Sequence, residues 1–166
     1  MNLEVVRSRA EKPDVPAAAV SKFAIAAVSQ LDSVIALTEA LLSLTRPVAE
    51  PVEITAIVRH IEALVAPVVR ADGGCLDLEG SFDELGFSSA NGNAVRLAVG
   101  AVMLAAVDAS PQVRCAVVAS EARATIRFDT GGGSTPAIDT AVVRAAAETG
   151  IRIQAGSGAI SISFPR

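Results

Sequence analysis

Residues 94–133 read AVRLAVGAVMLAAVDASPQVRCAVVASEARATIRFDTGGG, and this stretch decides the order of elements in the second half of the chain. Its first part, Ala94 to Ala109, is small and apolar on nearly all sides, which is typical of a buried helix. Runs of strand length follow at 113–119 and 122–128, with Ser120-Glu121 as the predicted hairpin turn. The glycines after Asp129 indicate a loop. The stretch therefore predicts a buried helix followed by a pair of strands.

The same alternation of helices and strands continues on both sides of this stretch. Towards the C-terminus, a helix is predicted over Ile138–Thr149, followed by strands over 151–154 and 159–164. Towards the N-terminus, the polar segment Ser81–Asn93 indicates a loop, and Cys75–Glu79 predicts a strand. Residues 73–166 are thus expected to form a small α/β sandwich.

The first half of the chain predicts two long amphipathic helices. Residues 17–45 and 53–71 carry wide apolar stripes at helical spacing, and a proline-containing linker over 48–52 joins them. Such helices are expected to pair as an antiparallel hairpin, and their stripes are too wide for one hairpin to cover. We therefore expect residues 17–72 to form a four-helix bundle in a homodimer, after a loose arm over residues 1–16.

Composition narrows the classes of partner. Hydrophobic residues make up 51% of the 166, and charged residues 19%, which excludes global disorder. Leu97–Val107 is the longest uncharged apolar run and is too short for a bilayer, and no signal peptide is seen, so a cytoplasmic protein is expected. A net charge of −4 without Trp or Tyr argues against nucleic acid. Cys75 and Cys115 lack metal-ligand spacing, and we expect no metal and no cofactor.

The order of these elements resembles a degenerate sensor histidine kinase core, and it is also similar to kinase-like histidine phosphotransferases of phosphorelays. In that family the second helix opens with a Pro-Val-Asp-Leu-like phrase, here Pro51-Val52-Glu53-Ile54, and the sandwich closes with a strand ending in Pro165. The resemblance implies an α+β fold, in which a helical hairpin precedes an ATPase-type sandwich. It covers about residues 17–166.

The nucleotide site implied by the resemblance is incomplete in this sequence. Asp129, Gly131 and Gly133 match the family's Asp-x-Gly-x-Gly, in which the aspartate reads the adenine amino group. Ala101 and Ala105 stand where the family has two asparagines that help hold Mg-ATP, and alanine offers no oxygen ligand. Residues 136–147 contain no glycine-rich lid. A glycine-rich turn that needs positive φ is the simpler reading of 129–133.

The phosphoacceptor histidine is also missing from its expected window, Ala26–Gln30. The only histidine is His60, on the flank of the second predicted stripe, where it is either a boundary residue or a phosphoacceptor. Ser29, Gln30 and Asp32 lie near the expected acceptor position. They are either ordinary polar positions or candidates, with His60, for docking a partner.

These observations leave several functions open. The first hypothesis is a non-catalytic two-component protein that dimerises and docks a response-regulator receiver domain or a histidine kinase, as an adaptor, scaffold or inhibitor without ATP use. The second is an enzyme: a divergent kinase that binds ATP through Asp129, or a phosphotransferase that relays phosphate through His60. The third is a structural dimer module whose partner is unrelated to phosphorelays. Whether the chain is an enzyme stays open, and the sequence favours a protein without enzymatic activity.

Overall fold

The computed structural model describes residues 8, 17–45, 51–78, 82–120, 122–132 and 134–166. Its helices are α2 (Ala17–Thr45), α3 (Ile54–Ala71), α4 (Gly92–Ala109) and α5 (Thr140–Glu148), with a short 3-10 helix η1 (Phe82–Leu85). Its strands are β1 (Val52–Glu53), β2 (Cys75–Leu78), β3 (Phe87–Ser88), β4 (Gln112–Ala119), β5 (Arg123–Asp129), β6 (Arg152–Gly156) and β7 (Ala159–Pro165). The predicted order is confirmed, and β1, η1 and β3 are additions to it. Three parts of the sequence predictions lie outside the described residues: the N-terminal arm except for Ser8, most of the linker, and Gly133.

Local capping explains where the sandwich helices begin. The Asn91 side chain accepts hydrogen bonds from the backbone N–H groups of Asn93 and Ala94, at 3.0 and 3.3 Å. This cap starts α4 at Gly92, inside the segment that we expected to be loop. Asp139 caps α5 in the same way, accepting from Ala141 N–H at 2.8 Å. The expected helix over 138–149 is therefore shorter at both ends.

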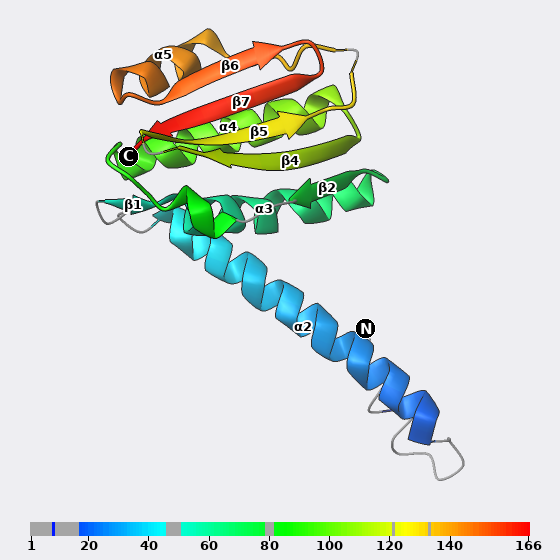
Figure 1. Cartoon of the computed structure of the whole chain (residues 1–166). Helices are drawn as coiled ribbons and strands as arrows, with labels where there is room; N and C mark the ends of the chain where they lie inside the picture. The colour runs from blue at the N-terminus through cyan, green and yellow to red at the C-terminus, as the bar shows by residue number, and fades with distance from the viewer. Residues whose placement is uncertain (1–7, 9–16, 46–50, 79–81, 121, 133) are drawn as a thin grey trace. The chain divides into compact units, whose positions relative to one another are not determined.

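The main sheet has five strands in the order β2-β4-β5-β7-β6. β2 runs parallel to β4, and the other neighbours are antiparallel. Because successive side chains on a strand point to opposite faces, Ile126 and its partner Ile162 lie on one face while Arg127 and Ser161 lie on the other. The first face is buried and packs against α4, which Figure 1 shows behind the sheet.

Helix α3 belongs to the same hydrophobic core as the sheet. Its residues Ile54, Ile57, Val58 and Ile61 are buried in one cluster with α4 and the inner face of the sheet. Thr55 also donates a hydrogen bond to the carbonyl oxygen of Phe82 at 2.6 Å. The sequence predicts that this stripe faces α2 and a second subunit. The structure instead assigns the stripe of α3 to the core of the sandwich.

The chain divides into two units, Met1–Glu39 and Ala40–Arg166. α2 carries a row of exposed large apolar side chains: Ile25, Val28, Leu31, Val34, Ile35, Leu41 and Leu42. Among the described residues, Ser21–Leu42 and Gly92–Ala109 are long and apolar enough to cross a membrane by length and composition. Gly92–Ala109 packs one face into the core, as the apolar sequence predicts, whereas Leu97 and Leu104 on the same helix are exposed.

Candidate functional site

Asp129 ends β5 and faces away from α4. Phe128 before it is fully buried in the core, so alternation directs the Asp129 side chain to the open face of the sheet. There its Oδ1 accepts a hydrogen bond from Arg127 Nε at 2.8 Å, and both side chains remain about half exposed. The carboxylate that reads adenine in the resembling family therefore pairs here with an arginine on the solvent side.

Thr130, which the sequence did not suggest as a site residue, points to the inner face of the sheet. It is 5% exposed, and its backbone N–H donates to the carbonyl oxygen of Gly158 at 2.8 Å. The signal for it was present in the sequence, because the inward set Ala124, Ile126 and Phe128 continues to Thr130 at the same two-residue spacing.

The glycines after Thr130 serve the turn itself. Gly131 and Gly132 have φ values of 73° and 86°, which favour glycine. A Cβ on Gly158, in the β6–β7 turn, would lie 2.8 Å from the Gly132 Cα, so the two backbones pack directly on each other. Between Gly131 and the Asp139 cap of α5, the described residues form neither helix nor strand. This short connection explains the glycines without a nucleotide.

The two alanines at the expected asparagine positions lie one turn apart on α4, where Ala105 is buried and Ala101 is partly buried. α4 packs on the inner face of the sheet, whereas the Asp129 carboxylate lies on the outer face. The structure therefore does not bring Asp129 together with Ala101 and Ala105. The described residues also contain no group of three or more metal-ligating side chains of the His, Cys, Asp and Glu types.

His60 lies on α3 and is partly exposed. Its neighbour Arg59 forms an ion pair with Glu62 at 3.0 Å and stacks over the Phe82 ring at 5.0 Å. In the described part of the chain, the His60 imidazole makes no hydrogen bond or ion pair. Solvent can therefore reach a ring that its own unit does not hold in place.

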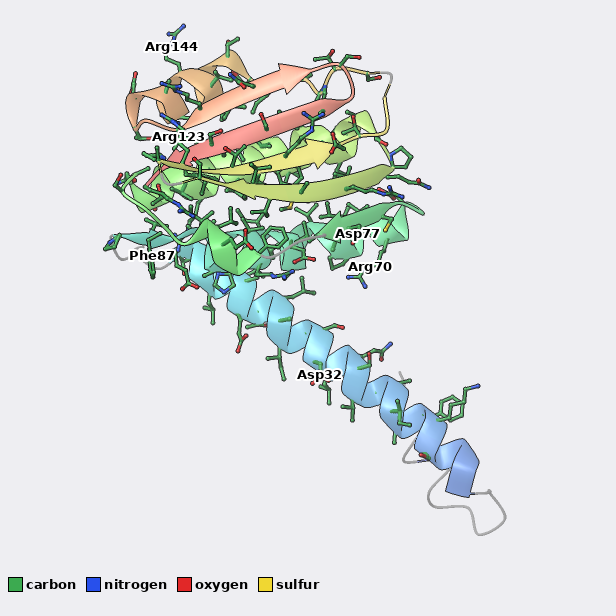
Figure 2. All side chains as sticks on the ribbon, in the orientation of Figure 1. Asp32, Arg70, Asp77, Phe87, Arg123 and Arg144 are labelled. Atoms are coloured by element: carbon green, nitrogen blue, oxygen red, sulfur yellow. The ribbon has the colours of Figure 1, made fainter. Side chains whose placement is uncertain are left out.

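The docking candidates on α2 are all exposed. They are Ser29, Gln30 and Asp32, and Figure 2 labels Asp32 on this helix. The Ser29 carbonyl oxygen accepts a hydrogen bond from Ser33 Oγ at 2.9 Å. These residues belong to the first unit and His60 belongs to the second, so each unit presents its candidates separately.

The cysteines differ in accessibility. Cys75 is exposed on β2, and Cys115 is buried on β4. Burial raises the pKa of the Cys115 thiol to about 12, with smaller contributions from the negative charges of Glu62 and Asp129, against which Arg59 acts. Cys115 is consequently a neutral core residue and not a nucleophile.

Two hollows on the second unit were missed by the sequence analysis. One of about 650 Å³ lies along β6 and the β6–β7 turn, with Arg127, Gln154 and Ser161 among its lining residues. The other, of about 410 Å³, lies between the C-terminal halves of α3 and α4. Both depend on how elements pack together, which periodicity along the chain does not reveal.

Comparison with known proteins supports the fold. No protein-family model matches the chain, and no curated protein matches its sequence. Among solved structures, the chain is similar to the Acinetobacter baumannii histidine kinase AdeS, with a TM-score of 0.51 and 11% identity over 99% of this chain and 95% of that one. The mixed α+β fold is thus histidine-kinase-like, as the order of elements indicated. Dimerisation stays a prediction.

Proposed function

We propose that this chain is a non-catalytic, cytoplasmic two-component signalling protein that dimerises and docks receiver domains of response regulators without using ATP. The observation that carries the proposal is a histidine-kinase-like fold whose expected Mg-ATP positions on α4 are Ala101 and Ala105. Two methyl groups offer no ligand to a hard cation. A fold is shared more widely than a function, so the receiver domain is proposed by analogy and needs a direct test.

The arrangement around Asp129 supports the absence of nucleotide chemistry. The carboxylate is held by Arg127 on the open face of the sheet, and the buried inward position belongs to Thr130. The connection from Gly131 to α5 has little chain for a lid. A nucleotide site needs a group that recognises adenine, oxygen ligands for the cation and a lid over the nucleotide. The described residues do not bring these groups together.

The exposed apolar row of α2 supports dimerisation. A helix of 29 residues is about 44 Å long, and exposed large apolar side chains recur along most of it. Two copies of such a helix bury these rows against each other by the packing used in helical bundles. Since α3 contributes its stripe to the sandwich core, we assign the dimer contact to α2. Asp32 and Glu39 on the same helix would be costly inside a bilayer, which favours a protein partner over a membrane.

Ser29, Gln30 and Asp32 are exposed polar residues of α2, and we propose them as positions at which a receiver domain contacts this helix. The test is binding of purified receiver domains, taken from the same genome, to the immobilised protein with and without Mg-ATP. We expect one receiver domain to bind with the same affinity in both conditions. Failure of every receiver domain to bind would remove the proposal.

Calorimetry separates this reading from a divergent kinase that uses Asp129. We expect no heat of binding with millimolar nonhydrolysable ATP analogue and Mg²⁺. Saturable heat that disappears in an Asp129→Asn variant would favour the kinase, and the same heat in the variant would indicate a nucleotide site elsewhere.

A second candidate function is phosphoryl relay through His60, favoured by the accessible and unpartnered imidazole. Incubation with a phosphorylated receiver domain tests it, with His60→Gln as the matched variant. Label on the wild type that is lost in the variant would establish a phosphotransferase. We expect the wild type and the variant to stay equally unlabelled.

A further inference from the structure

The hollow between α3 and α4 is an apolar groove with an acidic end. Its walls are Leu64, Val65 and Val68 on α3 together with Leu104 and Val107 on α4. Val68 is 61% exposed and Leu104 52% exposed, so large apolar surface faces solvent on both walls. The groove has a volume of about 410 Å³. It lies wholly within the second unit, whose core fixes both helices.

One end of the groove is formed by the last turns of both helices. Asp72 follows α3 as its C-cap, and Asp108 lies in the last turn of α4. The segments that follow the two helices are joined there: Cys75 N–H donates to the Pro111 carbonyl oxygen at 2.7 Å, and a Cβ on Gly74 would lie 2.6 Å from that same oxygen. The acidic end is therefore a rigid part of the sandwich.

The charges at this end have no internal compensation. Neither Asp72 nor Asp108 makes a hydrogen bond or ion pair through its carboxylate in the described part of the chain. Each helix C-terminus adds about half a negative charge through its aligned peptide dipoles. The last turn of α4 has no basic residue, and that of α3 has only Arg70, whose Nε donates to the Ala66 carbonyl oxygen at 3.2 Å. Figure 2 shows Arg70 projecting away from the sheet.

We infer that this groove is a docking site for an amphipathic helix of a partner protein, with apolar anchors on one face and an arginine or lysine at one end. The walls supply helical ridges, because Leu64 and Val68, and likewise Leu104 and Asp108, are four residues apart. A docked helix of about three turns seats its apolar side chains between the ridges and its cation beside Asp72 and Asp108. The partner is expected to be basic at this end because Asp72, Asp108 and the two helix C-termini are all negative. The inference does not depend on the proposed receiver-domain docking.

The chain offers matched controls for both parts of this site. Leu97 lies on α4, two turns before Leu104, with a nearly equal exposure of 51%, but it does not line the groove. Asp77 is an exposed aspartate on β2 of the same unit, also outside the lining. Because all these side chains are exposed, Leu→Ala and Asp→Asn changes at them should leave the fold intact, which circular dichroism checks.

The probe is a synthetic amphipathic helix of about 14 residues with leucine anchors and a terminal arginine, alongside a twin in which glutamine replaces the arginine. Fluorescence anisotropy measures both affinities for the full chain. We expect the arginine peptide to bind about five- to tenfold more tightly at low salt. The double variant Asp72→Asn with Asp108→Asn should remove this preference, and Asp77→Asn should retain it.

The apolar walls give a second readout. Leu104→Ala should weaken both peptides about tenfold, whereas Leu97→Ala should change either affinity by less than about twofold. Equal binding of the two peptides to the wild type, or equal losses in Leu97→Ala and Leu104→Ala, would overturn the inference. So would dissociation of the protein's own oligomer in Leu104→Ala, because the groove would then be occupied by a second copy of the chain.

Discussion

Helices α2 and α4 are built from similar residues and have opposite surroundings. Both are rich in alanine and large aliphatic side chains, and both are long and apolar enough to cross a membrane by length and composition. α4 packs Val95, Val99 and Val102 completely into the sandwich core, whereas α2 exposes a row from Ile25 to Leu42. The comparison shows that composition makes a helix apolar, while the elements that pack against the helix decide whether its apolar face is buried.

The largest expected effect comes from placing the same charge on each helix. Val102→Asp buries an unpaired carboxylate in the core and should destabilise the sandwich by about 4 kcal/mol or more. Val34→Asp, on the exposed row of α2, should leave hydrogen exchange of the β5 and β7 amides unchanged while dissociating the proposed dimer. Exchange rates measured below the dimer dissociation constant check this. Loss of protection in both variants would show that the two helices share one core.

A backbone change in the sandwich comes next in size. Gly158→Ala puts a Cβ 2.8 Å from the Gly132 Cα at a φ of +70°, so we expect a loss of about 2–3 kcal/mol in the free energy of unfolding. Gly156→Ala is the matched control, because it meets nothing within 4 Å and has no positive φ. Urea denaturation measures both. Equal effects would mean that the Gly132 contact is not tight in solution.

Alkaline pH should weaken the sandwich through Cys115. Its pKa in the folded protein is about 12, against an ordinary value of 9.0, so the unfolded chain loses this proton at lower pH than the folded protein. The stabilisation is therefore complete below pH 9 and is lost as the pH rises towards 12, by at most about 1.4 kcal/mol per pH unit. The absence of Tyr simplifies this titration.

Urea denaturation at several pH values tests this pH dependence. The Cys115→Ala variant should show a shallower decline in stability above pH 9 than the wild type, while Cys75→Ala at the exposed position should follow the wild type. Parallel curves for the wild type and Cys115→Ala would assign the alkaline sensitivity to other groups.

The smallest effects concern single hydrogen bonds at the two helices. Asn91→Ala removes the N-cap of α4 and should cost about 1 kcal/mol. Ser33→Ala on α2 removes only a hydrogen bond back to the Ser29 carbonyl oxygen and should change stability by less than about 0.5 kcal/mol. Thermal denaturation of both variants compares them. A larger loss at Ser33 than at Asn91 would reverse the contrast between the helices.

Much of the fold could be predicted because periodicity and glycine placement are local signals. The bounds of α2 agree with the expected 17–45, and the strands differ by one or two residues. Which element packs against an apolar stripe could not be predicted in the same way. The apolar face of α3 fits a bundle as well as a sandwich, and only the packing of Ile57 and Ile61 among α4 residues decides between them.

The candidate site was predicted less well than the fold, for a related reason. The match of Asp129, Gly131 and Gly133 to a motif says nothing about which face of β5 the carboxylate takes. Alternation from the buried Phe128 puts it on the outer face, where Arg127 binds it. The groove between α3 and α4 combines residues 64–74 with 104–111, and no pattern along the chain joins these segments.

The central claim is that the exposed row of α2 is an interface between two copies of this chain. Sedimentation velocity at micromolar concentration tests it most directly, because it gives the mass of the particle in solution. The chain mass is 16.9 kDa, and we predict a species of twice that mass which Val34→Asp reduces to the single-chain value. A wild-type protein that sediments as a single chain at these concentrations would contradict the claim.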